Sequence, residues 1–225
     1  MINIAIDGPS GAGKSTVAKA LAKKLHFVYV DTGAMYRCIG LYVHRCGVDA
    51  HDADAVAALL PKITVSLSYA EDGEQHVYLN GEDVSFAIRE NVISLITSTI
   101  SKIPAVRAHL LSLQREMAAS HHVIMDGRDI GTVILPGAQL KIFLFASAEA
   151  RAKRRTKELI SRGQEADFET ILAEINARDI QDQSRETAPL VPASDAVMMD
   201  NSDMTIAQNV DAICMLLAQR GILNV

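Results

Sequence analysis

Short apolar runs and helical patterns alternate from the start of the chain. The run from Ile2 to Ile6 is apolar and leads directly into a loop of glycine, proline and serine, which is typical of a buried strand. Residues 14–25 then repeat apolar positions at spacings of three and four, which predicts a helix with one apolar face. A second short apolar run, Phe27 to Val30, follows. This order of strand, helix and strand predicts a parallel α/β sheet with a crossover helix.

The same pattern returns in the second half of the chain. Residues 122–125 and 140–145 are short apolar strand candidates, and residues 196–199 form a weaker one. Helical patterns follow the last two, with a break at residues 162–165 and a proline-containing loop at 189–192. These segments predict further strands and helices of the same α/β core.

The middle of the chain has a different pattern. Residues 63–69 and 76–79 flank the turn-like sequence Glu71-Asp72-Gly73-Glu74. This arrangement is typical of a small antiparallel hairpin. We therefore interpret residues 35–105 as an excursion from the main sheet.

Composition narrows the class of protein. The chain has 225 residues, of which 49% are hydrophobic and 22% are charged. This favours one compact domain with insertions and excludes disorder as the main state. No apolar run approaches the roughly 18 residues needed to cross a bilayer, and Asp7 stands where a signal peptide needs apolar sequence. We predict a soluble, cytoplasmic protein that does not bind membranes.

Charge and cysteine content add two exclusions. The formal net charge is −5, whereas binding along a nucleic acid needs a basic face, so we predict no nucleic-acid partner. Three cysteines without a CxxC pair do not resemble a disulfide framework, and we expect reduced thiols. Any anionic ligand must therefore be held by local clusters of Lys and Arg.

A phosphate-binding pattern, G-x-x-x-x-G-K-[ST], occupies residues 8–15, between a predicted strand and a predicted helix as the pattern requires. Glycines let backbone N–H groups surround phosphate oxygens, and the helix N-terminus adds partial positive charge. We expect Lys14 to reach the terminal phosphates and the Ser15 hydroxyl to ligate Mg²⁺. The predicted nucleotide site consists of Gly8, Pro9, Ser10, Gly11, Ala12, Gly13, Lys14, Ser15 and Thr16.

This loop alone does not choose a reaction, because hydrolases, switches and kinases all use it. The guanine-reading motif N-K-x-D is absent, since no Asn precedes a Lys in the sequence. That absence argues against a GTPase switch.

Two charged segments follow predicted strands, at the edge of a parallel sheet where ligands bind. Asp31 ends the second strand, and Arg37 lies about one helical turn further on. They fit either an acceptor and metal site or a helix cap with a solvated arginine. Residues 126–129 read Asp-Gly-Arg-Asp directly after a buried strand. Three charges in that position favour a polar ligand over a neutralised surface turn.

Arg178, Asp182 and Arg185 are spaced i, i+4 and i+7, so on a helix they share one face. Arginine binds phosphate bidentately, and a carboxylate accepts from sugar hydroxyls. Spacing alone nevertheless favours a solvated ladder of Asp and Arg over a ligand site.

The densest basic patch contains Arg151, Arg154 and Arg155, shortly before the break at Gly163. This patch is equally consistent with a mobile lid over transferring phosphates and with a solvated helix face. The residue pattern leaves both interpretations open.

Taken together, the motifs resemble the bacterial cytidylate kinases, a family of nucleoside monophosphate kinases. The resemblance covers nearly the whole chain through, in order, GPSGAGKST, DTGAMYR, PAVR, DGRDIGTVILP and INARDIQDQSRETAPLVPA. It implies an α/β fold of the P-loop NTPase type with a five-stranded parallel sheet flanked by helices. The implied P-loop core comprises residues 1–34 and 106–225, with an acceptor-binding insert at 35–105 and a lid at about 150–167.

The resemblance also implies roles for individual residues. Arg37 and Arg128 are expected to hold the acceptor phosphate. Cytosine is expected to be read by Ser98, Arg107 and Asp129. The remaining acceptor contacts are expected from Thr32, Tyr36, Arg178, Asp182 and Arg185. Catalysis is expected to depend on Lys14, Arg128, Asp129, Arg154 and Arg178. Phe145 departs from the family pattern, because many relatives carry an acidic residue there.

The implied reaction transfers the γ-phosphoryl group of ATP to CMP or dCMP with Mg²⁺, giving ADP and CDP or dCDP, and we expect a monomer with these small-molecule partners. The acceptor phosphate is already nucleophilic, so alignment and charge neutralisation matter more than a general base. Two alternatives stay open. One is a kinase acting on UMP, AMP or a small metabolite, and the other is a nucleotide-binding regulator without turnover.

Overall fold

The computed structural model describes residues 1–70 and 75–223, and the chain forms two compact units. The first unit contains Met1–Phe27 and His121–Val225, and the second contains Val28–Ser120. The predicted division into a P-loop core and an acceptor-binding insert at residues 35–105 concerns nucleotide binding and stays a prediction.

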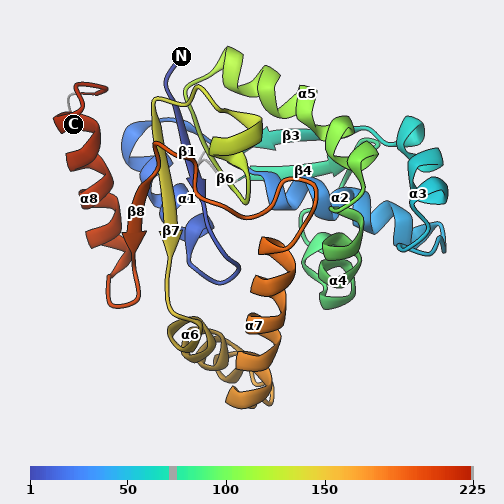
Figure 1. Cartoon of the computed structure of the whole chain (residues 1–225). Helices are drawn as coiled ribbons and strands as arrows, with labels where there is room; N and C mark the ends of the chain where they lie inside the picture. Colours follow the sequence, from blue (N-terminus) through green and yellow to red (C-terminus); the bar gives the residue numbers. More distant parts are fainter. Residues whose placement is uncertain (71–74, 224–225) are drawn as a thin grey trace. The chain divides into compact units, whose positions relative to one another are not determined.

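The main sheet has five strands in the order β2-β6-β1-β7-β8, of which Figure 1 labels β6, β1, β7 and β8. Their bounds are β1 Asn3–Asp7, β2 Val28–Asp31, β6 Val123–Gly127, β7 Leu140–Phe145 and β8 Val197–Asp200. Within the first unit, β1 pairs in parallel with β6 and β7, and β7 pairs in parallel with β8. The five-stranded P-loop architecture is therefore confirmed, and each strand lies close to the apolar run that predicted it.

The central strands carry continuous apolar sequence because both of their faces are covered. Ile4, Ala5 and Ile6 in β1 and Ile124 and Met125 in β6 are fully buried. The core of the first unit therefore lies at the centre of this sheet, and the polar ends of these strands emerge at one edge.

Helix α1 (Lys14–Leu25) follows the glycine-rich loop and packs against β6 and α8 (Ile206–Gln219). Its buried residues are Lys14, Val17, Ala18, Leu21, Ala22 and Leu25. The predicted apolar face is confirmed, and Lys14 is buried with it. Helix α8 begins at a capping box between Thr205 and Gln208, which satisfies the free N–H groups of its first turn.

Helices α6 (Ala148–Ser161) and α7 (Phe168–Gln183) pack against each other and are separated by the predicted break at residues 162–165. Ser147 and Asp167 cap their N-termini by accepting from the third backbone N–H beyond each. The lid predicted at 150–167 covers most of α6 and the turn after it, and closure of this segment stays a prediction.

The second unit combines helices with an antiparallel sheet of order β3-β4-β5. Its strands are β3 Val65–Tyr69, β4 Gln75–Leu79 and β5 Glu82–Asp83. The predicted hairpin is confirmed in its two main strands, whereas its turn, Glu71 to Glu74, lies outside the described residues. The helices are α2 Thr32–Arg45, α3 Ala53–Leu59, α4 Asn91–Ile100 and α5 Pro104–Ser120.

Several elements of the structure have no counterpart in the sequence prediction. They are the strand β5, the helices α3, α4 and α5, the 3-10 helices η1 (Leu60–Lys62) and η2 (Ala87–Arg89), and the π-helix η3 (Ile130–Ile134). Local capping explains one of them, because Asp52 accepts a hydrogen bond from Ala55 N at 2.9 Å at the start of α3. The π-helix depends instead on a strand far away in the sequence.

The three cysteines form no disulfide among the described residues, with Cys38 and Cys214 buried and Cys46 exposed, and the expected reduced state stays a prediction. None of the helices within residues 1–70 and 75–223 has the length and apolar character needed to span a bilayer.

Candidate active site

The phosphate loop runs from Gly8 to Gly13, between the end of β1 and the start of α1. Gly13 precedes α1 in the left-handed conformation, with φ of 83°, which favours glycine. Gly8 also requires glycine, since a Cβ there would lie 1.9 Å from the carbonyl oxygen of Leu144. Lys14 Nζ reaches back across the loop and donates to Pro9 O at 2.8 Å. The loop therefore has the curvature and the helix N-terminus that a phosphate site needs.

Lys14 is almost completely buried, with 6% of its surface exposed. Burial, together with the nearby Arg128 guanidinium, lowers the pKa of Lys14, and the carboxylates of Asp126, Asp7 and Asp182 only partly oppose this effect. A bound phosphate would supply the negative charge that this ammonium group needs. The electrostatics of the loop thus favour an anionic ligand.

Ser15 and Asp126 form the part of the site that suits a cation. Ser15 Oγ donates to Asp126 Oδ2 at 2.8 Å, and Asp126 is buried at the end of β6. Among the described residues, no three His, Cys, Asp or Glu side chains gather as a metal cluster. A hydroxyl and one carboxylate match Mg²⁺, which binds few protein oxygens and completes its shell with water and phosphates.

Asp126 was not predicted as a metal ligand, although the sequence contained a signal. It directly follows the buried run Val123 to Met125, so it had to lie at a strand end. Asp126 lies 111 positions from Ser15 in the sequence, so the local pattern does not reveal the hydrogen bond between them.

Arg128, Asp182 and Arg185 form a second charged group, which we call the arginine–aspartate cluster. Arg128 Nε donates to Asp182 Oδ2 at 2.8 Å, and Arg185 donates to the other carboxylate oxygen. Burial would raise the pKa of Asp182, but Arg128, Arg185 and Arg178 outweigh it and hold the pKa below its usual value. Asp182 is 1% exposed, so the interpretation as a solvated ladder is wrong.

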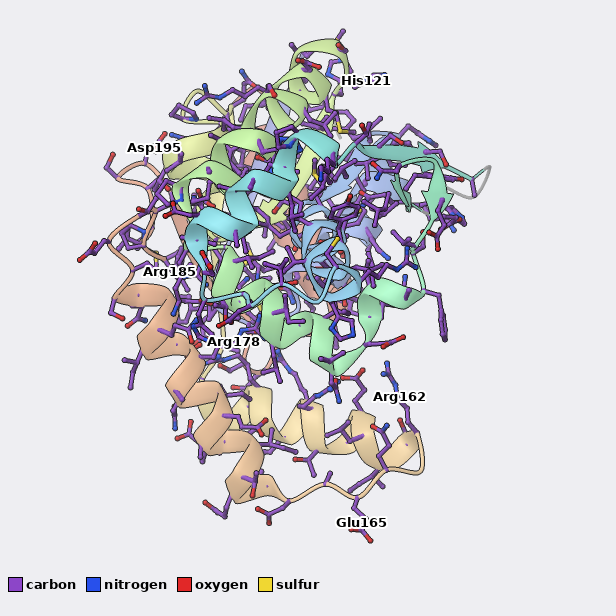
Figure 2. The ribbon with its side chains drawn as sticks, turned by 90° about the vertical axis from the view of Figure 1, so that its right-hand side faces the viewer. His121, Arg162, Glu165, Arg178, Arg185 and Asp195 are labelled. Atoms are coloured by element: carbon purple, nitrogen blue, oxygen red, sulfur yellow. The ribbon has the colours of Figure 1, made fainter. Side chains whose placement is uncertain are left out.

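The prediction that all three α7 residues share one helix face is only partly right. Helix α7 ends at Gln183, and Ser184 is its C-cap, so Arg178 and Asp182 lie on the helix and Arg185 lies beyond it. The chain turns there because Leu190 N donates back to Asp182 O at 2.8 Å. Figure 2 shows Arg162 and Glu165 at the turn that joins α6 to α7, while Arg178 and Arg185 lie toward the opposite end of α7.

Arg151 does not belong to a solvated helix face, because it is 4% exposed. Its guanidinium pairs with both carboxylate oxygens of Asp179, at 3.0 and 2.5 Å. It also donates to Ser10 O in the phosphate loop and to Ala146 O, each at 3.0 Å. Arg151 therefore ties α6, α7 and the phosphate loop together.

Arg154 and Arg155 differ although they are adjacent. Arg154 donates to Asn201 O at 2.5 Å and to Ser202 O at 2.9 Å, so the solvated-face interpretation is wrong for this residue as well. Among the described residues, the ion-pair partner of Arg155 is Glu158, its neighbour on the same helix, at 3.0 Å. The basic patch predicted from the sequence is thus divided by the fold.

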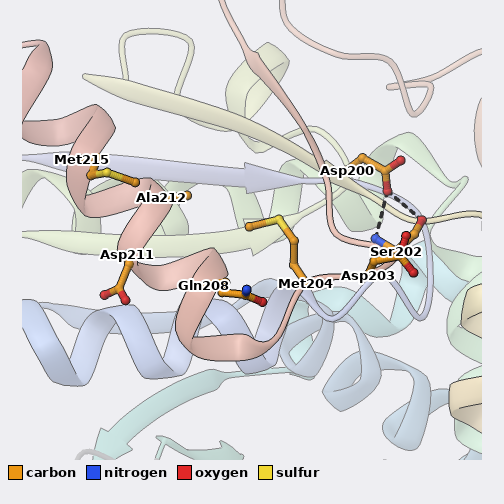
Figure 3. Close-up of a pocket in the computed structure, with 8 residues that line it drawn as sticks. All are labelled: Asp200, Ser202, Asp203, Met204, Gln208, Asp211, Ala212 and Met215. Atoms are coloured by element: carbon orange, nitrogen blue, oxygen red, sulfur yellow. Dashed lines mark hydrogen bonds between the residues drawn. The ribbon is translucent and has the colours of Figure 1, made fainter.

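The loop after β8 braces the phosphate loop, which the sequence analysis did not predict. Asn201 Nδ2 donates to Ala12 O at 2.7 Å. Asp200 orders this loop by accepting from Ser202 N and Oγ, as the dashed lines in Figure 3 show. A surface hollow of about 510 Å³ lies between this loop and α8. Of its carboxylates, Asp200 is satisfied locally and Asp211 pairs with Lys24 at 2.8 Å.

The predicted acceptor residues of the second unit gather around the start of α2. Asp31 caps this helix by accepting from Ala34 N at 2.8 Å, and its other oxygen lies 3.3 Å from Arg37, so the cap is present but Arg37 is paired with Asp31 and is not simply solvated. Thr32 and Tyr36 are buried in the first turns.

Arg107 and Ser98 belong to α5 and α4. The Arg107 guanidinium lies 5.7 Å from the ring centre of Tyr36, close enough for a cation–π contact. Arg107 also donates to Ser101 O at 3.3 Å, and Ser101 bonds to Ser98 O. The second unit thus links Tyr36, Arg107 and the end of α4 near Ser98.

Comparison with known proteins identifies the family of this chain. A family model described as "Cytidylate kinase" matches residues 4–219. The chain belongs to the cytidylate kinase family. This membership confirms the predicted resemblance and supports the predicted reaction, ATP-dependent phosphorylation of CMP.

Relatives named cytidylate kinase are similar to this chain over most of its length. One from Streptococcus agalactiae serotype Ia is 50% identical over 91% of this chain and 90% of its own. One from Mycobacterium avium is 49% identical over 97% of this chain and 96% of its own. A solved structure of an uncharacterized protein from Eubacterium ventriosum superposes with a TM-score of 0.52 at 14% identity, over 97% of this chain and 99% of that one. This last likeness concerns the fold alone.

Proposed function

We propose that this cytidylate kinase family member transfers the γ-phosphoryl group of ATP to CMP or dCMP, with Mg²⁺, in pyrimidine nucleotide metabolism. The observation that carries the proposal is the arrangement of the phosphate loop: Lys14 lies across it, and the Ser15 hydroxyl bonds to Asp126. Monomeric state, cytoplasmic location and the lack of a nucleic-acid partner stay predictions.

The donor nucleotide is assigned to residues 8–16. The loop N–H groups and the Lys14 ammonium bind the phosphates, and Ser15 with Asp126 would hold Mg²⁺. Bound there, Mg²⁺ would supply positive charge that neutralises the nucleotide phosphates. Arg151 and Asn201 support the loop through the carbonyls of Ser10 and Ala12.

The acceptor is assigned to the residues that the family resemblance implies. We assign its phosphate to Arg37 and Arg128, and its base to Ser98, Arg107 and Asp129. The sugar and remaining phosphate contacts are assigned to Thr32, Tyr36, Arg178, Asp182 and Arg185. The acceptor phosphate oxygen is the nucleophile, so these residues act by alignment and by neutralising charge.

Catalysis in this proposal depends on positive charge that is already in place. The Asp182 carboxylate holds Arg128 and Arg185 in fixed directions before any ligand binds. Groups ordered in advance cost little reorganisation when charge spreads over the transferring phosphoryl group. Arg154 and Arg178 are the further arginines that we assign to catalysis.

A coupled assay for ADP tests the proposal, with ATP and Mg²⁺ and one acceptor at a time: CMP, dCMP, UMP or AMP. We expect ADP formation that depends on CMP or dCMP, with much lower kcat/KM for UMP and AMP. Preference for UMP, AMP or another metabolite would favour the related-kinase alternative. ADP formation that does not depend on any acceptor would contradict the proposed transfer.

A further inference from the structure

Asp7, the last residue of β1, lies directly before the phosphate loop and has no role in the assignments above. It is 4% exposed. Its two carboxylate oxygens accept from consecutive backbone N–H groups, Ile130 N on Oδ1 and Gly131 N on Oδ2, each at 2.7 Å. These are the first two N–H groups of the π-helix η3 (Ile130–Ile134). Asp7, at the end of β1, therefore caps the N-terminus of this π-helix, from which it is distant in sequence.

Asp129 stands at the position from which a side chain usually caps a helix. An aspartate at an N-cap commonly accepts from the first free N–H groups. In the part of the chain that the structure describes, the Asp129 side chain does not cap η3. Asp7 accepts from those donors instead, so the first N–H groups of η3 do not require the Asp129 carboxylate.

The contact between Asp7 and η3 leaves little room for a side chain at Gly131. A Cβ at Gly131 would lie 3.3 Å from Asp7 Oδ2 and 3.1 Å from Lys141 Cδ. A methyl group at this position would require Lys141, Asp7 or η3 to shift by a few tenths of an ångström. The cap is thus a tight connection between the strand that leads into the phosphate loop and the turn that follows Asp129.

Burial makes the ionised form of the Asp7 carboxyl group unfavourable. Burial raises the pKa of Asp7 to about 6, with Asp129 adding to the rise, although the two N–H bonds and Lys14 oppose it. Above that pH the protein keeps a buried carboxylate where a neutral amide of the same shape would avoid the desolvation cost. Charges held at such a cost are concentrated at functional sites.

We propose that Asp7 is a positioning residue for the acceptor nucleotide: by capping η3 it holds Arg128 and Asp129 in the orientation that binds and recognises CMP. Both residues directly precede the capped turn. Arg128 is held on its other side by Asp182, so the segment is fixed at two points. This inference rests on the proposed function.

The first test is Asp7→Asn, measured with CMP, UMP and ATP as varied substrates. The amide keeps one acceptor oxygen and turns an NH₂ group toward a backbone N–H, so one charge-assisted bond is replaced by a contact between donors. We expect kcat/KM for CMP to fall about tenfold or more. The CMP-to-UMP ratio, which is kcat/KM for CMP divided by kcat/KM for UMP, should fall about threefold or more. KM for ATP and the melting temperature should change little.

Gly131→Ala provides a second variant that leaves Asp7 in place. Its methyl group would crowd Asp7 Oδ2, so the ratio of kcat/KM for CMP to that for UMP should fall in the same direction. If Asp7→Asn does not fold, Gly131→Ala decides the question. The matched control is Thr132→Val in the same π-helix, because among the described residues the Thr132 hydroxyl is buried without a hydrogen-bond partner. The control should keep the wild-type ratio.

If the wild-type protein is active and both test variants keep its CMP-to-UMP ratio, the inference about Asp7 is wrong and the proposed function still stands. Loss of CMP and ATP binding in equal proportion, together with a lower melting temperature, would also overturn it, because that result describes a purely structural residue. Absence of CMP-dependent ADP formation by the wild type would instead overturn the proposed function.

Discussion

The phosphate loop and the arginine–aspartate cluster both place positively charged groups, but they are built in different ways. The loop is continuous in sequence, and its shape follows from glycines and from the N-terminus of α1. The cluster takes Arg128 from the end of β6 and Asp182 and Arg185 from the end of α7. In the loop, backbone groups make the site, whereas in the cluster one carboxylate orders two guanidinium groups.

This difference teaches how each region should respond to substitution. A site made by backbone N–H groups tolerates the loss of most side chains, and only Lys14 and Ser15 add specific chemistry. A site made by side chains around Asp182 depends on every member, because loss of one leaves buried charge without a partner. The following predictions test this contrast.

The largest expected effect is that of Lys14→Ala. Removing the ammonium group leaves the loop backbone intact but withdraws charge from the transferring phosphoryl group, so kcat should fall about 10²- to 10³-fold and ATP should bind more weakly. Lys23→Ala on the same helix is the control, because Lys23 is exposed. Circular dichroism checks the fold, and a near-wild-type kcat would refute the role assigned to Lys14.

Asp182→Ala should break the arginine–aspartate cluster. Both Arg128 and Arg185 lose their shared partner, so the free energy of unfolding should fall by about 3 kcal/mol, and kcat/KM for CMP should fall with it. Chemical denaturation and the coupled assay measure the two effects. Gln183→Ala, at the neighbouring exposed position, is the control. A stable Asp182→Ala variant with full activity would show that the cluster is dispensable.

Asp129→Ala should mainly change base preference. A carboxylate accepts from the N4 amino group of cytosine and repels O4 of uracil, a contact worth about 1 to 3 kcal/mol of discrimination. The ratio of kcat/KM for CMP to that for UMP should therefore narrow by roughly one to two orders of magnitude. An equal fractional loss with both nucleotides would mean that Asp129 orients Arg128 instead of reading the base.

The smallest expected effect is that of Arg155→Ala. Arg155 pairs with Glu158 at 3.0 Å on a half-exposed helix face, and such pairs contribute less than about 1 kcal/mol. Its near neighbour Arg151 is buried and bidentate with Asp179, so Arg151→Ala should destabilise the protein several times more. Equal effects in denaturation experiments would contradict the division of the basic patch by the fold.

The α/β core was predictable because each of its strands is a short apolar run next to a turn signal. The helices α3 to α5 were not predicted, although the buried residues Ile93 and Ile100 of α4 lie seven positions apart, which is a helical spacing. The π-helix η3 could not be predicted from local sequence at all, because its first N–H groups are satisfied by Asp7.

By itself, the sequence determined the phosphate loop, the family and the main strands. Consecutive residues suffice for these features, because glycine conformation, a helix start and an apolar strand are local properties. Only the tertiary structure decided the partners of the charged residues. It paired Arg151 with Asp179, ended α7 before Arg185, and brought Asp7 to the π-helix. The two pairings depend on contacts between separate segments of the chain, and the end of α7 depends on the turn that Leu190 N makes with Asp182 O. The spacing of residues within one segment does not reveal such contacts.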